Sequence, residues 1–506
     1  MSTWSRHPVI YEINTWVWLS SIASRIGRSV LLSSVPAADW DALAEFGFEA
    51  VWLMGVWERS PASRAIANHN QVLLDDFRRT LPDFRPEDNI GSAYSVRRYT
   101  VDSELGGAAG LAIARQELAR RGMQLILDFV PNHVALDHPW VVEHPEYFVL
   151  GSAEEARDDP SSFAEIEGRV YARGRDPYFP AWPEVLQLNA FDEGMRRASI
   201  QTVSAIAEQC DGVRCDMAML LLNAIFEQTW GQRAGQRPEK EYWTELIPAV
   251  RKSRPDFLFM AEAYWDREWD LQQLGFDYCY DKRLYDRLEH GGAESVRLHL
   301  CAEPTYQAKL VRFIENHDEP RAASAFPGAK EEAAALTAST IPGARLFHEG
   351  QFEGRRIRTG VFLRRCPDEQ PDEARHRFYK TLLKAIDDPL FHSGEWRLCQ
   401  CTGWPDNPTF RNLVAWCWEQ GEDRAIVVVN LSGAPAQGRV HWPWEDFQKT
   451  TWQLHDCLSG AIYIRDGREL DQQGLYVDLE AWKGHLFRCA REAAPAEAAA
   501  EFISLA

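Results

Sequence analysis

Short apolar runs alternate with longer amphipathic segments over the first three quarters of the chain. The runs are rich in β-branched and aromatic residues, as buried strands are, and the segments between them repeat apolar residues at the three- and four-residue spacing of helices. The eight runs are VIYEINTWVWL (9–19), EAVWLMGVW (49–57), MQLILDFV (123–130), DGVRCDM (211–217), DFLFMAEAY (256–264), FDYCY (276–280), KLVRFIEN (309–316) and ARLFHEG (344–350). Eight strand–helix units predict an α/β fold, a closed (β/α)8 TIM barrel. An open doubly wound sheet is the alternative, but no glycine-rich phosphate turn follows the first run.

Two connections are too long for simple crossovers. Residues 58–100 follow the second run, and residues 134–186 follow the third and are rich in Pro, Asp, Gly and aromatic residues, which predicts a loop-rich inserted subdomain. Beyond residue 390 short apolar runs come at close intervals with turn residues between them, which is typical of antiparallel β structure. We therefore expect a barrel from 1–133 and 187–389, the insert at 134–186, a C-terminal β-sandwich domain at 390–490 and a flexible tail at 491–506.

Composition and charge narrow the class of protein. Hydrophobic content of 45% and charged content of 26% are ordinary for a globular chain. The net charge of −20 argues against nucleic acid, whose phosphates require a basic face. No apolar stretch is long enough to span a bilayer, and we see no cleavable signal, so we expect no membrane partner. Ten dispersed cysteines are consistent with the reducing cytoplasm, and 20 tryptophans give weak support for a carbohydrate ligand.

Charged residues follow four of the predicted strands, although strand interiors usually avoid charge. Asp128 ends the third run, Arg214 and Asp216 the fourth, Glu262 the fifth, and Asp318 follows the seventh. Each residue alone has an ordinary structural explanation, such as a helix cap or an ion pair. In a barrel, however, the carboxyl ends of all strands meet at one mouth, and a cluster of charges there is normally functional.

These segments resemble the short signatures of the α-amylase superfamily of retaining glycoside hydrolases. The matching segments, in the order of that family, are DFVPNH (128–133), GVRCD (212–216), FMAEAYWD (259–266) and FIENHD (313–318). A further QLN (187–189) resembles the extra motif near the end of the family's inserted domain. The resemblance covers residues 8–390 as barrel and insert, and the β-rich remainder looks like the family's C-terminal domain.

The resemblance implies catalytic roles for three carboxylates. Asp216 would be the nucleophile, kept ionised by Arg214 two residues away on the same strand. Glu262 would be the general acid and then the base, which requires a raised pKa and a less polar setting, as Tyr264 and Trp265 would provide. In a retaining mechanism the carboxyl groups of Asp216 and Glu262 would stand roughly 5–5.5 Å apart, against about 6.5–9.5 Å in an inverting one.

The resemblance also implies residues that bind the sugar in the cleaved subsite. Asp318 would bind hydroxyls and stabilise the oxocarbenium-like transition state. His133 and His317 would hydrogen-bond the same ring, and Tyr94 would stack on it. Asp128 and Asn132 would organise the site rather than react.

The expected function is therefore that of a retaining α-glycosidase acting on small α-glucosides or malto-oligosaccharides by double displacement. Arg98 stands where the family often has Asp, and Met219-Leu220 where many endo-acting α-amylases have Lys-His, which speaks against a starch-liquefying enzyme. A transglycosylase, phosphorylase or isomerase of the same superfamily is the alternative, and a catalytically inactive carbohydrate-binding relative is the third reading. Lys282 and Arg283 could meet a sugar phosphate, although rim salt bridges explain them more simply.

The expected partner is a small carbohydrate, and the oligomeric state is unreadable from the sequence. The chemistry requires no cofactor. Calcium is kept as an alternative, because Asn132 matches a position that ligates this ion in many relatives, and hard oxygen ligands suit it. The insert offers further carboxylates at Asp158, Asp159 and Asp176.

Overall fold

The computed structural model describes residues 4–444 and 447–491, which divide into two compact units. The first unit runs to Glu289 and includes Ala302–Lys384. The second contains His290–Cys301 together with the chain from Ala385 onward. The two units are described separately.

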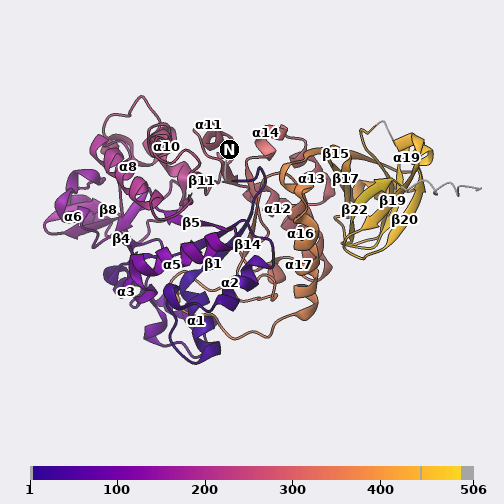
Figure 1. Ribbon diagram of the computed structural model, residues 1–506. Helices are drawn as coiled ribbons and strands as arrows, with labels where there is room; N and C mark the ends of the chain where they lie inside the picture. Colours follow the sequence, from indigo (N-terminus) through magenta and orange to yellow (C-terminus); the bar gives the residue numbers. More distant parts are fainter. Residues whose placement is uncertain (1–3, 445–446, 492–506) are drawn as a thin grey trace, which may run out of the picture. The chain divides into compact units, whose positions relative to one another are not determined.

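Eight parallel strands of the first unit form a closed barrel, so the predicted (β/α)8 fold is confirmed (Figure 1). All eight runs contribute a strand: β1 (Val9–Asn14), β2 (Ala50–Met54), β5 (Gln124–Phe129), β10 (Gly212–Cys215), β11 (Leu258–Ala261), β12 (Tyr278–Tyr280), β13 (Leu310–Arg312) and β14 (Ala344–His348). Around the barrel their order is β1-β14-β13-β12-β11-β10-β5-β2. Nearly every strand residue is buried, which explains why the strands read as continuous apolar runs rather than as alternating ones.

The first apolar run divides into two elements. β1 ends at Asn14, whose side chain accepts a hydrogen bond from the backbone N–H of Val17 and caps helix α1 (Thr15–Ile26). The expectation of one strand over residues 9–19 is therefore wrong beyond residue 14, because an asparagine N-cap outweighs the β-propensity of the tryptophans that follow. The second run also divides: Gly55 has a φ of 77°, and β3 (Trp57–Arg59) then pairs outside the barrel with β4 (Val96–Val101).

Helices connect the barrel strands and cover their outer face. Figure 1 shows α5, α8, α16 and α17 around the strands. The longer helices of this part of the chain are α2 (Ala37–Ala44), α5 (Gly107–Arg120), α8 (Glu193–Ala207), α9 (Asn223–Trp230), α10 (Tyr242–Arg251), α11 (Glu268–Gln273), α12 (Lys282–His290), α16 (Ala329–Thr340) and α17 (Glu373–Ile386). Their apolar faces complete the layered core that a TIM barrel requires.

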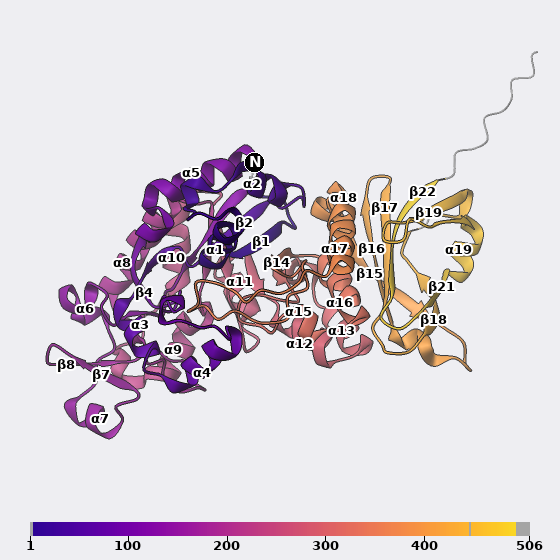
Figure 2. The same cartoon turned by 90° about the horizontal axis from the view of Figure 1, so that it is seen from below.

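The two long connections carry structure of their own. The first holds α3 (Pro61–Ala67) and α4 (Gln71–Thr80), and the second holds β6 (His133–Ala135), α6 (Trp140–Glu143), α7 (Ala153–Asp158), β7 (Phe163–Ile166), β8 (Arg169–Ala172) and β9 (Val185–Gln187). In Figure 2 the elements α6, α7, β7 and β8 lie together at one side of the barrel unit. The antiparallel pair β6–β9 closes this insert at its base and places Gln187 opposite His133.

The second unit is built on one connected eight-stranded antiparallel sheet, in the order β20-β19-β22-β17-β16-β15-β18-β21. β15 pairs with β16 through its first half and with β18 through its second half, so the sheet is continuous through this one strand. The strands are β15 (Glu395–Thr402), β16 (Leu413–Gln420), β17 (Asp423–Asn430), β18 (Ala436–His441), β19 (Thr451–Asp456), β20 (Ile462–Asp466), β21 (Leu475–Leu479) and β22 (Gly484–Arg491), with helices α13 (Ala293–Leu300), α18 (Pro389–Ser393) and α19 (Gly467–Gln473). The tail from residue 492 lies outside the described residues. No helix within the described ranges has both the length and the apolarity needed to cross a membrane.

Candidate active site

Three neighbouring barrel strands bring the central residues together. Arg214 on β10 lies directly opposite Asp128 on β5, and Cys215 lies opposite Ala261 on β11. The ladder continues past the strand ends, where the N–H of Glu262 donates to the carbonyl of Cys215 over 3.0 Å. Asp216 and Glu262 therefore leave adjacent strands at the same level, which is the arrangement that the sequence predicts.

A pocket of about 310 Å³ opens at these strand ends. Five of the predicted site residues line it: Asp216, Glu262, Asp318, Tyr94 and His133. Its other walls come from the two long connections, from the segments after β10 and β11, and from the loop after β14, through Ser92, Trp182, Glu184, Val185, Met217, Tyr264, Val361 and Phe362. We call it the inner pocket.

The guanidinium of Arg214 lies close to all three carboxylates. Its guanidinium is fully buried and contacts Asp216 Oδ1 at 2.7 Å, Glu262 Oε2 at 2.9 Å and Asp318 Oδ2 at 3.9 Å. A buried cation needs compensating charges, and here it is surrounded by carboxylates and by the faces of Trp52, Tyr94 and Tyr280. The predicted Arg214–Asp216 pair therefore exists, and it extends to Glu262 as well.

The surroundings give the carboxyl groups different proton affinities. Burial raises the pKa of Glu262 to about 7, although Arg214 opposes the shift. Burial also raises the pKa of Asp216, and its direct ion pair with Arg214 counteracts this. Burial would raise the pKa of Asp318 too, but His317 outweighs it and holds that pKa well below the ordinary value. Glu262 therefore keeps its proton to a higher pH than an ordinary glutamate, whereas Asp318 stays ionised.

His317 lies beneath the inner pocket between two carboxylates. Its Nδ1 contacts Glu12 of β1, and its Nε2 lies 3.0 Å from Asp318 Oδ2 and 2.8 Å from the hydroxyl of Tyr94. Burial alone would lower the pKa of His317, but Asp318 and Glu12 raise it well above the ordinary value. Carboxylate oxygens thus face both ring nitrogens, which favours the protonated imidazolium form of His317.

Tyr94 and His133 form part of the pocket wall. The ring of Tyr94 stacks on His317 with centroids 5.3 Å apart. His133 packs beside Trp182 of the insert, and burial lowers its pKa to about 4, so that it is neutral near pH 7. Asp128 is buried behind them and accepts the N–H of Gly55 over 3.2 Å, consistent with an organising role.

The residues around Asn132 do not fit a calcium ion. Its Oδ1 accepts a hydrogen bond of 2.9 Å from Nε2 of Gln187, which is fully buried and also donates to the carbonyls of Asn132 and Leu188. An amide nitrogen thus occupies the space among the oxygen atoms that a cation would need. Asp176 caps its own turn, and no group of three His, Cys, Asp or Glu residues suited to a metal occurs among the described residues.

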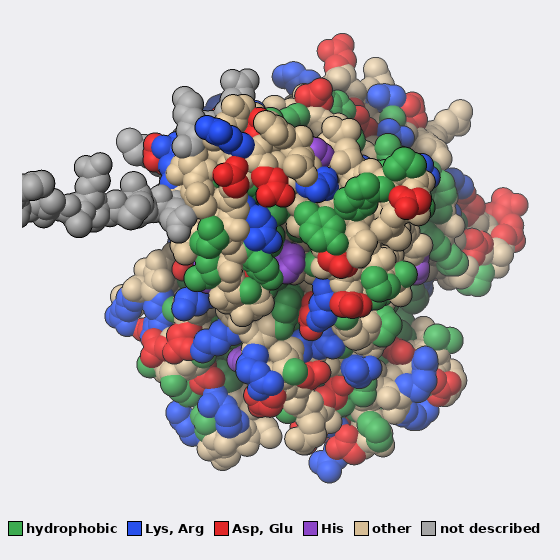
Figure 3. Space-filling model, turned by 90° about the vertical axis from the view of Figure 1, so that its right-hand side faces the viewer, with side chains coloured by type: hydrophobic (Ala, Val, Ile, Leu, Met, Phe, Trp, Pro, Cys, Tyr) green, Lys and Arg blue, Asp and Glu red, His purple; other side chains and the backbone are tan. Residues whose placement is uncertain are grey.

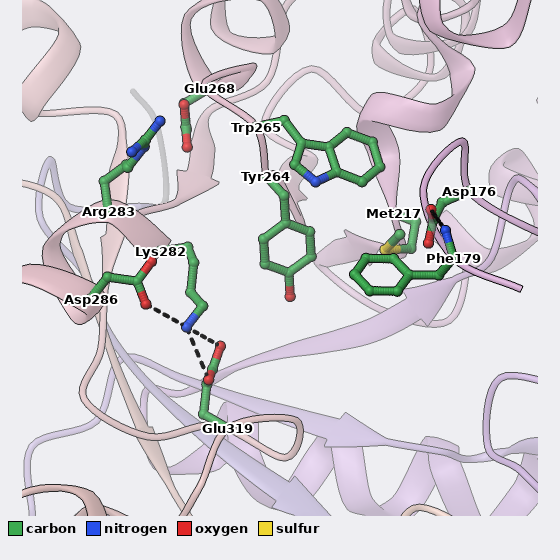
Figure 4. A pocket seen from close by; sticks show the side chains of 10 residues that line it. All are labelled: Asp176, Phe179, Met217, Tyr264, Trp265, Glu268, Lys282, Arg283, Asp286 and Glu319. Carbon is green, nitrogen blue, oxygen red and sulfur yellow. Dashed lines mark hydrogen bonds and ion pairs between the residues drawn. The ribbon is translucent and has the colours of Figure 1, made fainter. Parts of the chain in front are cut away.

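A second cavity of about 460 Å³ adjoins the inner pocket and shares Met217 and Tyr264 with it (Figure 4). We call it the outer cavity. Figure 4 shows Lys282 reaching Glu319 and Asp286, with distances of 3.1 and 2.8 Å. Arg283 pairs with Asp266. Both cations that the sequence offered for a sugar phosphate are therefore engaged in ion pairs.

Some residues of the site were not predicted from the sequence. Trp182, Val361 and Phe362 line the inner pocket from loops whose course no local pattern reveals. Glu12 carried a detectable signal, because it is a charge inside the apolar strand VIYEIN, the same feature that marked Arg214. Its partner His317 lies 305 residues away, so the pairing appears only in three dimensions.

The fold and this site define a (β/α)8 barrel protein with an acidic cluster at the carboxyl ends of its strands. Residues 39–284 match the family model for the alpha amylase catalytic domain. The resemblance inferred from the motifs is thereby confirmed.

Relatives and solved structures agree with this assignment. The chain is 25% identical over 441 residues to the alpha-amylase MalA of Haloarcula japonica, covering 85% of this chain and 56% of that protein. It is 25% identical over 142 residues to the oligo-1,6-glucosidase of Parageobacillus thermoglucosidasius, covering 28% and 19%. The chain thus spans only about half the length of the first of these. The fold is that of the alpha-amylase of Geobacillus thermoleovorans solved with acarbose, with a TM-score of 0.67, 16% identity and coverage of 97% and 100%.

Proposed function

We propose that this protein is a retaining α-glycosidase that cleaves α-glucosidic bonds in small α-glucosides or malto-oligosaccharides. One observation carries the proposal: Asp216, Glu262 and Asp318 line one sugar-sized pocket, and all three face the guanidinium of Arg214. Glycoside hydrolysis through a covalent intermediate needs two carboxyl groups of different proton affinity beside one bond. The third carboxylate suits the positive charge that develops on the sugar ring.

In this mechanism Asp216 attacks the anomeric carbon while Glu262 gives its proton to the leaving oxygen. Water then attacks the glycosyl-enzyme, Glu262 takes the proton back, and the configuration is retained. The raised pKa of Glu262, about 7, supports its role as the acid. The ion pair with Arg214 supports a carboxylate at Asp216.

The sugar ring would be held by the remaining wall residues. Tyr94 offers its ring for stacking, and His133 offers a neutral imidazole. Both nitrogens of His317 already face oxygen atoms, so we propose that His317 acts mainly by fixing Asp318, in addition to any bond it makes to the substrate.

The main alternative is group transfer within the same superfamily. The outer cavity would receive the leaving group or an acceptor, since it adjoins the inner pocket through Tyr264. Its walls carry four carboxylates, at Asp176, Glu268, Asp286 and Glu319, against the paired Lys282 and Arg283. This balance favours water or a sugar hydroxyl over phosphate as acceptor, which speaks against the phosphorylase.

Net charge and cysteine content bear on the proposed partner and the proposed cellular location. A net charge of −20 and the intermingled acidic and basic side chains on the face displayed in Figure 3 support a neutral carbohydrate partner rather than nucleic acid. The ten cysteines are free thiols, which supports the proposed cytoplasmic location.

The test is a panel of α-linked di- and trisaccharides read by mass spectrometry, with the wild type and Asp216→Asn. We expect the variant to lose at least about 10³-fold in rate on whichever saccharide the wild type cleaves, because the amide cannot attack the anomeric carbon. Asp192→Asn is the matched control, since Asp192 caps α8 and asparagine caps equally well. Wild-type rates in Asp216→Asn would overturn the proposal. Added phosphate or acceptor sugar in the same panel separates hydrolysis from transfer.

A further inference from the structure

The two carboxyl oxygens of Glu262 have different surroundings. Oε2 accepts a hydrogen bond of 2.6 Å from the backbone N–H of Met217 and lies 2.9 Å from Nη2 of Arg214. A backbone N–H and a guanidinium can only donate. A proton placed on Oε2 would therefore point at donors, so this oxygen is the unprotonated one.

Oε1 has a partner of another kind. The hydroxyl of Tyr264 lies 2.9 Å from it, and a phenol can either donate or accept. Burial raises the pKa of Tyr264 well above the ordinary value, so the hydroxyl keeps its own proton. Tyr264 lines both the inner pocket and the outer cavity, and Figure 4 shows its hydroxyl pointing into the space that Lys282 and Glu319 border. Oε1 thus contacts the hydroxyl of a residue that lines both cavities.

The backbone that carries Tyr264 is held in an unusual conformation. Trp265 and Asp266, the next two residues, have φ angles of 59° and 60°, which non-glycine residues rarely adopt. Such backbone is strained and persists where other contacts support it. Here Asp266 pairs with Arg283, and Trp265 packs edge-on against Tyr178 at 4.8 Å. Both residues of the turn that follows Tyr264 therefore have side-chain contacts.

We propose that the catalytic proton of Glu262 resides on Oε1, and that Tyr264 is a positioning residue that holds this oxygen in both protonation states. The inference rests on the proposed function, because it assumes that Glu262 is the general acid and base.

The hydroxyl serves each step differently. In the first step, the proton leaves Oε1 for the glycosidic oxygen, that oxygen keeps the electron pair of the broken bond, and Asp216 forms the new bond to carbon. Tyr264 then donates to the anionic Oε1. In the second step, water loses a proton to Oε1 while its oxygen displaces Asp216, and Tyr264 accepts from the restored O–H. The same contact therefore holds Oε1 in place before and after each transfer.

The test compares two substrates whose leaving groups differ in their need for a proton. α-D-Glucosyl fluoride releases fluoride with little acid assistance, whereas the neutral saccharide that the wild type cleaves best releases an alkoxide and needs the acid. For Tyr264→Phe, which keeps the ring, we expect a loss in kcat of about tenfold or more on the saccharide, a part of the 10²–10⁴ that general acid–base catalysis supplies. On the fluoride we expect a much smaller loss. The basic limb of the pH profile should move to higher pH, because the carboxylate form of Glu262 loses a donor.

A double-mutant cycle isolates the contact. In the Glu262→Gln background, Tyr264→Phe should cause no further loss, since the group through which Tyr264 acts is gone. Tyr171→Phe is the matched control, because it removes a buried hydroxyl that donates to the carbonyl of Val141, outside both cavities. It should leave both rates and the pH profile unchanged.

Three outcomes would overturn the inference: equal losses on both substrates, no loss on either, or a full additional loss in the Glu262→Gln background. Failure of the proposed function is distinguishable from these. A wild type that cleaves neither the fluoride nor any saccharide of the panel would remove the function itself, whatever the variants do.

Discussion

Glu12 is a carboxylate in the middle of an apolar strand, fully buried and in contact with Nδ1 of His317. Burying a charge is costly unless it is paired, so its position demands a partner. That partner in turn contacts Asp318 at 3.0 Å. Glu12 does not line the inner pocket. Its negative charge helps to raise the pKa of His317, and His317 in turn lowers the pKa of Asp318.

Glu12→Gln tests this chain of contacts. The amide keeps the shape of the side chain and one acceptor but removes one of the two negative charges that raise the pKa of His317. We expect that pKa to fall towards its ordinary value of about 6.5, so that the ring loses its proton as the pH rises above neutrality. The loss in kcat/KM should therefore be largest at alkaline pH and partly recovered at acidic pH. The measurement is a pH–rate profile of both proteins.

The control for this change is Glu315→Gln. Glu315 is equally buried and contacts another histidine, His348, at 3.0 Å, together with Arg321, but it lines neither cavity. It should alter stability without the alkaline loss of activity. An identical change of the pH profile in both variants would contradict a specific role for Glu12.

Among single residues, the sequence predicts those whose place directly after an apolar strand already indicates a role. Asp216 and Glu262 follow apolar strands directly, and the barrel geometry then brings them together. The roles of Glu12 and of the Tyr264 hydroxyl could not be predicted, because they depend on which oxygen faces which donor at about 3 Å, and no spacing along the chain encodes that. Asn132 shows the opposite case: its sequence suggested a cation ligand, but Gln187 reaches it from the far end of the insert.

Among the elements, β10 is central to the site, because it pairs with both β5 and β11 and places Arg214 and Asp216 between them. Its first residue is Gly212. A Cβ there would lie 2.9 Å from Cβ of Leu258 and 3.0 Å from its carbonyl oxygen, closer than side chains normally approach. The glycine lets two strands pack at the base of the segment that holds the nucleophile.

Gly212→Ala should therefore destabilise the barrel by about 1–3 kcal/mol, the usual effect of overpacking a well-filled core. Chemical denaturation with urea measures it, and kcat should fall as well, because a shift of β10 carries Arg214 with it. Gly292→Ala is the control: its added Cβ meets nothing within 4 Å, and its φ of −125° is open to alanine. Equal stability of the two variants would argue against a close β10–β11 contact.

Strand positions were predictable because a barrel strand is buried on both faces and reads as one apolar run. The residues at which strands and helices end were not predictable in this way. The run of residues 9–19 gave no sign that Asn14 would stop β1, since capping depends on a single hydrogen bond to Val17. Similarly, antiparallel β structure after residue 390 was predicted from its apolar runs, but β15 was not among those runs, and the continuity of the sheet rests on this strand, which changes partner midway.

For the whole molecule, pH dependence follows from the carboxyl groups that the fold buries. Burial raises the pKa of four glutamates to about 7: Glu262, Glu268, Glu315 and Glu349. In the unfolded chain a glutamate has lost its proton well below this pH. The folded state therefore binds more protons, and the stabilisation this gives at acidic pH is lost as the pH rises through about 7. Histidines with lowered pKa, such as His133, act in the opposite direction only below about pH 6.5, where the unfolded chain begins to protonate them.

We therefore expect the midpoint of thermal unfolding to fall when the pH is raised from about 6.5 to about 8, where the buried glutamates titrate; His317, whose pKa is also raised, adds to the fall because only the folded state keeps its proton. Repulsion from the net charge of −20 is a competing cause, and salt separates the two: surface repulsion is screened at high ionic strength, whereas protonation of buried groups is not. Glu315→Gln should flatten the dependence, because one of the four titrating groups is gone. A midpoint that is constant or rises over this interval, or a slope that salt abolishes, would show that the buried glutamates are ionised in the folded protein, and the acid role proposed for Glu262 would lose its support.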